Sequence, residues 1–318
     1  MGTIQFGIGA LYIAVVWLVG LRPTPTLTKD GKISVSNVGL WHSLGQLASM
    51  ISLGAGPVSF THIVKAMEPF FSALVSGVIF HKWMNPQVYM TLLPVVGGVG
   101  YACLKEASFS WLAFSAAMAS NVAFALRAVL SKNAMQSGKE VGLNLSPPNM
   151  FGLVTWAAFL LSIPIALAVE AWGFKDLLRD ALDSVENSWH FARTVFLSGL
   201  FHYLNNEVMY LALGNVHPVT LAVGNTMKRV FIMVASVMVF RNQITLQAGI
   251  GSAIGISGVL LYSLTKQYYE SSDRQQLQRQ QNKSAAASKG KRGIKTQTVV
   301  KTSILKSTPK VKVPSKKR

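Results

Sequence analysis

The sequence predicts an all-α membrane protein that crosses the bilayer many times. Half of its 318 residues are hydrophobic and only 13% are charged, against about 25% charged residues in an average globular protein. Long apolar segments recur along the chain, and about 20 apolar residues are enough to cross a bilayer as a helix. This composition excludes a soluble enzyme. The single cysteine, Cys103, excludes a disulfide framework and a cysteine-based metal site.

Nine apolar spans follow one another along the chain. Pro57 and Pro218 stand where two of them start, a position at which proline fits the first turn of a helix. We interpret residues 1–266 as one transmembrane domain. The spans cover residues 4–21, 35–54, 57–80, 87–104, 108–130, 149–170, 191–213, 218–240 and 245–265.

The formal net charge of +18 is concentrated at the C-terminal end of the chain. Residues 266–318 contain 15 Lys and Arg against 2 Asp and Glu, a net charge of +13, whereas residues 1–265 contain 15 against 10, or +5. Few large apolar residues accompany these charges, so we predict a disordered basic tail over residues 267–318. No aromatic residues interleave with its basic clusters at 289–292 and 315–318, which argues against nucleic-acid binding and favours contact with anionic lipid.

The chain contains a weak internal repeat. Gly-Pro-Val-Ser at 56–59 leads into a span that contains Lys65, and His-Pro-Val-Thr at 217–220 leads into a span that contains Lys228. The following span of each copy is rich in glycine, which suits close helix packing. We predict a ten-helix fold of two five-helix copies, the second inserted upside down, with the first helix missing from this chain. Inverted repeats are typical of secondary transporters, so residues 1–266 are interpreted as a transporter domain.

Two adjacent cations, Lys228 and Arg229, lie near the centre of the span 218–240. A charge at that depth costs about 2.5–3.5 kcal/mol on insertion scales. A helix end whose side chains reach the headgroups is the alternative, but Val230 and the apolar residues after it continue the span. We therefore predict an interior pair that binds an anion. Phosphate, with a charge of about −1.5 to −2, is the natural candidate.

Lys65 is the matching cation of the other copy. His62 lies one turn before it and Glu68 one turn after it, on one face of the predicted helix. One interpretation is a neutralising Lys65–Glu68 pair. We favour the other, in which Lys65 meets the anion and Glu68 holds or competes for it. Three cations without an anion would disfavour movement between inward- and outward-facing states, which predicts coupled exchange of two anions.

Other polar side chains at membrane depth are candidates for the same site. Arg127 lies behind Asn121 and is either an anchor at a helix end or part of the site. Polar groups at this depth need partners, which are packing neighbours or a ligand. The remaining candidates are Gln46, Ser49, His202, Tyr203, Asn205, Asn206 and Glu207. The sequence presents no acid pair, metal cluster or nucleophile–base pair, so we predict neither an enzyme nor a cofactor or metal.

Two segments resemble the signature stretches of the plastid sugar-phosphate/phosphate translocators, which belong to the drug/metabolite transporter superfamily. One is Val-Ser-Phe-Thr-His-Ile-Val-Lys-Ala-Met-Glu-Pro-Phe-Phe at 58–71, and the other is Ala-Val-Gly-Asn-Thr-Met-Lys-Arg-Val at 222–230. Residues 121–127 and 131–132 also resemble the family's middle segment. The resemblance covers roughly residues 1–266. It implies ten helices in two inverted halves and strict exchange of phosphate for phosphorylated sugars or three-carbon acids.

The resemblance also implies roles for single residues. The family's phosphate-binding lysine, lysine and arginine fall on Lys65, Lys228 and Arg229. Its middle arginine, which serves the far end of the substrate, falls on Arg127, and Ser49 fits its small hydroxyl position.

Two positions depart from the triose-phosphate members of that family. Those members are similar here but carry histidine in place of Gln46 and tyrosine in place of Asn205. The segment 224–229 looks closer to the phosphoenolpyruvate, hexose-phosphate and pentose-phosphate subgroups. Triose phosphate or 3-phosphoglycerate is therefore the leading expectation, with those three substrate classes as alternatives.

The resemblance implies a multi-pass protein of the plastid (chloroplast) inner envelope membrane, with lipid, phosphate and a small phosphorylated compound as its partners. It also implies that the first helix and a transit peptide are missing from this chain. An endomembrane nucleotide-sugar transporter in the Golgi or ER membrane is an alternative, and so is a membrane scaffold without transport. The oligomeric state stays open, with a monomer as the simplest case.

Overall fold

A computed structural model describes most of the chain. The chain divides into two compact units, of which the first is Met1–Lys266 and the second begins at Gln267. The structure describes residues 1–81, 83–103, 109–170, 179, 188–215, 227–228, 230–232, 234–235, 238–239 and 245–306.

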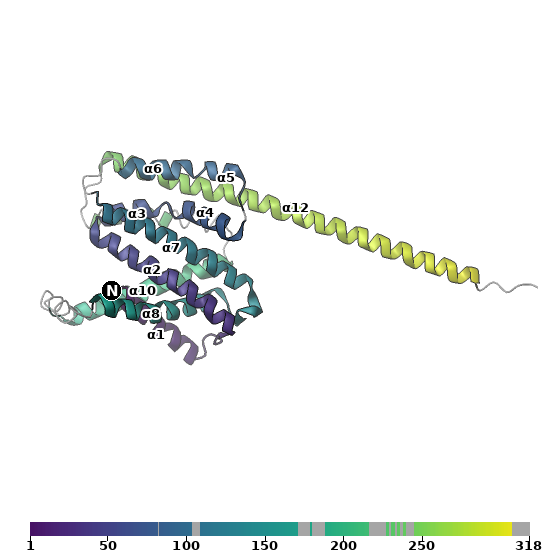
Figure 1. Cartoon of the computed structure of the whole chain (residues 1–318), viewed down its shortest axis with the longest axis horizontal. Helices are drawn as coiled ribbons and strands as arrows, with labels where there is room; N and C mark the ends of the chain where they lie inside the picture. Colours follow the sequence, from purple (N-terminus) through teal and green to yellow (C-terminus); the bar gives the residue numbers. More distant parts are fainter. Residues whose placement is uncertain are drawn as a thin grey trace, which may run out of the picture. The chain divides into compact units, whose positions relative to one another are not determined.

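The first unit is built almost wholly of helices, which Figure 1 labels in chain order. Two short strands, β1 (Thr26–Leu27) and β2 (Gly142–Leu143), form an antiparallel pair. A 3-10 helix, η1, spans Gly138–Glu140. The helices are α1 (Gly2–Leu18), α2 (Lys29–Ala55), α3 (Val58–Lys65), α4 (Glu68–Phe80), α5 (Pro86–Met90), α6 (Leu93–Cys103), α7 (Trp111–Gln136), α8 (Pro147–Glu170), α10 (Ser188–Asn215) and α12 (Leu246–Lys306).

These helices confirm the predicted all-α membrane fold. A helix or a pair of helices occupies every predicted span except 218–240, of which only a few residues are described. Among the described residues, 4 helical segments are long and apolar enough to cross a bilayer. They are Val58–Ile79, Trp111–Gln136, Pro147–Ala168 and Leu246–Gln281. The inverted repeat stays a prediction.

The predicted span 57–80 is two helices, because α3 ends at Lys65 and α4 begins at Glu68. Pro69 explains the break: proline has no N–H to donate to the carbonyl four residues earlier, and its ring clashes with that carbonyl. That carbonyl belongs to Lys65. Glu68 therefore belongs to the helix after the one that carries His62 and Lys65, and the shared face of these three residues stays a prediction.

A second proline breaks the span 87–104 in the same way. Pro94 is the second residue of α6, and α5 ends four residues before it, at Met90. Thr91 bridges the gap by donating its hydroxyl to the Val88 carbonyl at 2.7 Å. Both breaks thus follow from the position of a proline.

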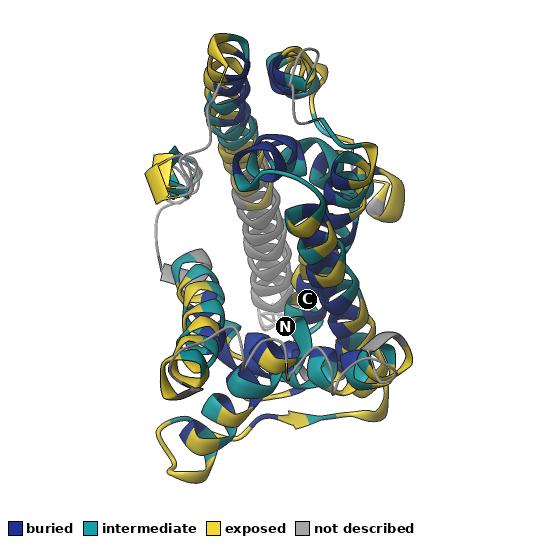
Figure 2. Ribbon diagram, turned by 90° about the vertical axis from the view of Figure 1, so that its left-hand side faces the viewer, coloured by how far each residue is buried: buried dark blue, intermediate teal, exposed yellow. Residues whose placement is uncertain are grey.

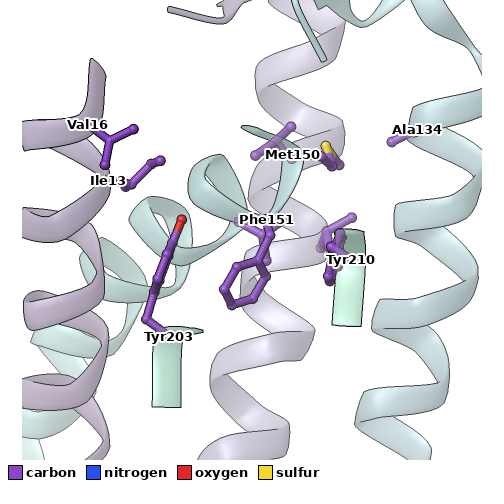
Figure 3. Packing of buried hydrophobic residues seen from close by; sticks show 10 residues of the cluster. Ile13, Val16, Ala134, Met150, Phe151, Tyr203 and Tyr210 are labelled. Atoms are coloured by element: carbon purple, nitrogen blue, oxygen red, sulfur yellow. The ribbon is translucent and has the colours of Figure 1, made fainter. Parts of the chain in front are cut away.

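The apolar core of one part of the unit lies between α1, α2, α8 and α10. Tyr203 of α10 packs beside Ile13 of α1 and against the ring of Phe151 of α8, at 5.1 Å between ring centroids (Figure 3). Tyr210, two turns further along α10, contacts the same ring at 5.0 Å. Figure 2 shows the buried residues on the faces that neighbouring helices turn toward one another.

The loops at one end of this helix group are joined by side chains. Asn149 donates to the carbonyls of Pro23 and Asn144 and accepts from Trp17 of α1. Arg22 forms an ion pair with Glu207 of α10, a carboxylate that is 5% exposed. Because Asn149 and Arg22 tie loops to helices distant in sequence, they fix how α1, α8 and α10 sit together.

Glycines bring the backbones of α6 and α12 into direct contact, as the predicted close packing requires. A Cβ atom added at Gly98 would lie 2.5 Å from the backbone nitrogen of Gly255, and one added at Gly258 would lie 2.8 Å from that of Val95. Higher residue numbers on one helix meet lower numbers on the other, so the two helices run antiparallel (Figure 1).

The second unit is the continuation of α12. Residues 267–306 are helical, whereas the sequence predicts disorder over 267–318. The described side chains between Ser271 and Gln281 are mostly exposed. Most helical stability in proteins comes from packing of an apolar face, so disorder of this tail in solution stays a prediction.

We expect Gly98→Ala to weaken the contact between α6 and α12, since the added methyl group has backbone atoms in its way. Overpacking of this kind costs about 1–3 kcal/mol. The midpoint of thermal unfolding in detergent measures the effect. Gly97→Ala is the matched control, because a Cβ atom there meets nothing within 4 Å; an equal effect of both substitutions would contradict the packing described.

Candidate functional site

Lys65 holds its ammonium group between two helices. Its Nζ donates to the hydroxyl of Ser49 on α2 at 2.6 Å and to that of Ser120 on α7 at 3.1 Å. The two hydroxyls also bond each other at 2.7 Å. The same Nζ lies 4.6 Å from the centroid of the Phe124 ring, a distance at which a cation is attracted to an aromatic face. These hydroxyl and aromatic contacts orient the ammonium group.

The end of α3 brings Lys65 to this place. Asn121 of α7, which is buried, donates its amide to the Val64 carbonyl at 2.9 Å. The Val64 carbonyl also accepts the backbone N–H of Met67 at 3.1 Å, so Asn121 adds a second bond in the last turn of α3. Gly45 lets α2 approach α7, because a Cβ atom there would lie 2.9 Å from the ring of Phe124.

Arg127 lies on the same helix as Phe124 and Ser120. Its guanidinium carbon lies 5.1 Å from the centroid of the Phe124 ring, so this ring contacts both Arg127 and Lys65. Its Nη1 is 3.2 Å from Nδ1 of His42 on α2. Its Nε atom is buried and has no hydrogen-bond partner among the described residues. Among the described residues, the side chains that contact the guanidinium of Arg127 are thus an imidazole and a phenyl ring, and neither is a carboxylate.

Two histidines lie next to Arg127. The imidazole of His42 stacks on that of His202 of α10, with ring centroids 6.4 Å apart and an angle of 19° between the planes. The Nε2 atoms of both rings are buried, and neither has a partner in the part of the chain that the structure describes. The charge of Lys228 also acts on His202. Residues of α2, α7 and α10 thus meet at one place near Lys228.

Gln46 is part of a separate chain of amides. Its Nε2 donates to Oε1 of Gln5 on α1 at 3.1 Å, and Nε2 of Gln5 donates to the Ser198 hydroxyl on α10 at 2.9 Å. Gln46 is 7% exposed. It is one turn before Ser49 on α2 and therefore lies on the side of the helix that carries the Lys65 partner.

The other predicted site residues differ in where they lie and in how far they are buried. Asn205 lies on an exposed face of α10 with Phe201, 64% exposed, and Val208, 60% exposed. His62 is partly buried in the last turn of α3. Lys228 is described and partly buried, whereas Arg229 lies outside the described residues.

The polar residues between positions 202 and 207 form a band on α10, and most of their contacts are internal to the protein. Asn206 donates its amide to the carbonyl of His202 in its own helix at 2.9 Å, and Glu207 pairs with Arg22. Only His202 of this band lies against the group around Arg127. The sequence leaves both packing and ligand contact open for this band, and the structure shows packing for Asn206 and Glu207.

Sequence reasoning missed His42 and Ser120. Each is a lone polar residue in a long apolar helix, and its partner lies far away in the sequence: Arg127 is 85 residues from His42, and Lys65 is 55 residues from Ser120. The one usable signal is spacing, because Ser120, Phe124 and Arg127 lie three and four residues apart on one face of α7.

Comparison with known proteins decides the family. A model described as the Triose-phosphate Transporter family matches residues 1–263. The chain belongs to this family. The predicted resemblance to plastid sugar-phosphate/phosphate translocators is thereby confirmed.

Curated relatives from plants share this family. Phosphoenolpyruvate/phosphate translocator 2, chloroplastic, of Arabidopsis thaliana is 38% identical over 265 residues, 82% of this chain and 68% of the relative. Xylulose 5-phosphate/phosphate translocator, chloroplastic, of the same plant is 36% identical over 264 residues, 83% of this chain and 62% of the relative. Triose phosphate/phosphate translocator, chloroplastic, of Pisum sativum is 37% identical over 276 residues, which are 86% of this chain and 67% of the relative. The chain thus spans 62 to 68% of the length of these relatives.

Ser120→Ala should weaken apparent phosphate affinity in transport by about tenfold, since a hydrogen bond to a charged group contributes about 1.5–3 kcal/mol. The half-saturating phosphate concentration of phosphate uptake measures it. Ser115→Ala is the matched control on α7, because the Ser115 hydroxyl is exposed and bonds the carbonyl of Trp111 in its own helix. Equal values for both variants would show that Ser120 does not orient Lys65 for phosphate.

Proposed function

We propose that this chain is a secondary antiporter that exchanges inorganic phosphate for a phosphorylated three-carbon compound or a sugar phosphate by alternating access. Triose phosphate or 3-phosphoglycerate is the leading substrate, with phosphoenolpyruvate, hexose phosphate or pentose phosphate as the alternatives. The observation that carries the proposal is the convergence of Lys65 and Arg127 on the ring of Phe124, inside a membrane domain of the Triose-phosphate Transporter family.

Phosphate fits the chemistry of this group. It carries about −1.5 to −2 charges near neutrality and accepts several hydrogen bonds. Lys65, already oriented by Ser49 and Ser120, would act as a point charge from one half of the protein. Lys228 and Arg229 would complete the clamp from the other half, in the segment that resembles the family's second signature stretch.

Strict exchange follows from the charges. Three basic side chains at membrane depth favour the states in which an anion is bound, because charge at this depth is costly. A bound phosphate or phosphate ester removes most of this cost. The change between inward- and outward-facing states then occurs with an anion bound, and every anion that leaves is replaced by another.

The names of the relatives all include phosphate as one of the two transported compounds. They are phosphate translocators whose other substrates are phosphoenolpyruvate, xylulose 5-phosphate, triose phosphate and glucose 6-phosphate, at 35 to 38% identity. This supports a shared site for phosphate and a variable wall for the rest of the molecule. These relatives are chloroplastic, which supports the inner envelope membrane of the plastid as the location.

A liposome experiment tests the function. Purified full-length chain is reconstituted in liposomes that contain phosphate, and uptake of labelled phosphate, 3-phosphoglycerate, phosphoenolpyruvate, glucose 6-phosphate and UMP is followed. We expect uptake of phosphate and of at least one phosphorylated three-carbon or sugar compound, and none into liposomes without internal phosphate. Exchange of UMP alone would identify a nucleotide-sugar carrier, and absence of all exchange would rule out antiport.

Lys228→Ala should lower phosphate exchange about 100-fold, because it removes a charged contact to the anion. Lys29→Ala is a matched control, since Lys29 is an exposed lysine at the start of α2. Initial rates of exchange in the same liposomes measure both. A Lys228→Ala protein that exchanges phosphate like the control would show that the assignment of the phosphate clamp is wrong, even with transport intact.

A further inference from the structure

A second polar contact lies one turn before Lys65 on the same helix. Thr61 of α3 and Ser52 of α2 bond each other through their hydroxyls at 2.8 Å, and Ser52 also bonds the carbonyl of Ala113 on α7 at 2.8 Å. All three residues are 0% exposed. Polar groups at membrane depth need partners, and these groups find theirs on one another across three helices.

The number of hydrogens decides which hydroxyl donates in this contact. A serine hydroxyl has one hydrogen to donate and two lone pairs that accept. Ser52 donates its hydrogen to the Ala113 carbonyl, so the bond between the two hydroxyls is donated by Thr61. Thr61 thus begins a series of two hydrogen bonds that runs from α3 through α2 to α7.

The hydrogen bonds of Lys65 join the same three helices in the same order. The ammonium group on α3 donates to Ser49 of α2, and Ser49 bonds Ser120 of α7. Thr61 and Lys65 are four residues apart on α3, and Ser52 and Ser49 are three residues apart on α2, so each pair shares one face of its helix. The two series of hydrogen bonds therefore lie one helical turn apart.

The bond from Thr61 restrains the backbone of α3 more tightly than the bonds from Lys65 do. The hydroxyl of a threonine is attached directly to a stiff, branched Cβ atom, whereas the ammonium group of a lysine ends a flexible stem of four carbons. α3 has only 8 residues, and helices this short depend on their neighbours for their position. Thr61 therefore sets how α3 is turned toward α2, and with it the point from which the side chain of Lys65 extends.

We propose that Thr61 and Ser52 are positioning residues of the phosphate site, which hold α3 so that the ammonium group of Lys65 meets the phosphate of the transported compound. Both hydroxyls are buried and bond each other and the Ala113 carbonyl, so they act through Lys65. The inference rests on the proposed function, because it requires that Lys65 binds phosphate. All transported compounds share the phosphate group, so a loss of positioning should affect all of them by the same factor.

Thr61→Val tests this role, because valine has nearly the shape of threonine but no hydroxyl to donate. The full-length chain is reconstituted in phosphate-loaded liposomes, and the concentration dependence of phosphate uptake is measured. We expect the half-saturating phosphate concentration to rise about fivefold, the effect of one hydrogen bond, with the maximal rate per folded protein near that of the wild type. The same factor should apply to whichever of 3-phosphoglycerate, phosphoenolpyruvate and glucose 6-phosphate the wild type exchanges fastest. Thr61→Ser keeps the hydroxyl and should restore the wild-type values.

Thr155→Val is the matched control. Thr155 of α8 is 2% exposed, and its hydroxyl bonds the carbonyl of Phe151 in its own helix at 2.9 Å. The same substitution there removes a buried hydroxyl that does not hold α3, so the half-saturating concentrations should stay at the wild-type values. Ser52→Ala removes the acceptor of Thr61 from the side of α2 and should act like Thr61→Val. It tests the proposal if Thr61→Val does not fold.

The two proposals fail in different ways. Absence of phosphate–phosphate exchange by the wild-type protein would overturn the proposed function and this role with it. Normal exchange by the wild type, with half-saturating concentrations that Thr61→Val and Ser52→Ala leave unchanged or that Thr155→Val raises equally, would leave antiport intact and overturn the positioning role. Unequal factors for phosphate and the second compound would overturn it too, because they would show that Thr61 affects the recognition of the rest of the substrate.

Discussion

The end of α3 at Lys65 is the constraint on which the candidate site depends. Pro69 cannot donate to the Lys65 carbonyl, so the helix stops there and restarts at Glu68. Broken helices at membrane depth are tolerated where protein or a water-filled cavity covers them. Here Asn121 of the neighbouring α7 supplies the cover by bonding the Val64 carbonyl. The position of the ammonium is therefore set by the backbone as well as by its own contacts.

Phe124 connects this end of α3 to the rest of the site. Its ring contacts Lys65 and Arg127, and it lies 6.0 Å from the ring of His42. The approach of α2 depends on the absence of a side chain at Gly45. An aromatic ring attracts cations to its face. One apolar residue thus keeps two positive charges in place near each other.

Much of the fold could be predicted from the sequence, because the length and apolar character of each span reflect the thickness of the bilayer. The break after Lys65 could have been predicted too, since Pro69 is visible in the sequence and removes one hydrogen bond. The cluster around Arg127 could not, because no local pattern shows that His42, 85 residues earlier, faces it. A lone histidine in an apolar helix has the same local sequence whether it packs or binds. Asn205, which is exposed on α10, stays a prediction as a substrate contact.

The antiparallel contact between α6 and α12 has a consequence for the substitutions that this part of the membrane domain tolerates. Glycines on both helices meet backbone atoms of the other helix, so the distance between the two backbones depends on the absence of side chains at these positions. Gly98 meets the backbone of α12, and Gly251 and Gly258 meet the backbone of α6. Any residue larger than glycine at these positions therefore pushes the two helices apart.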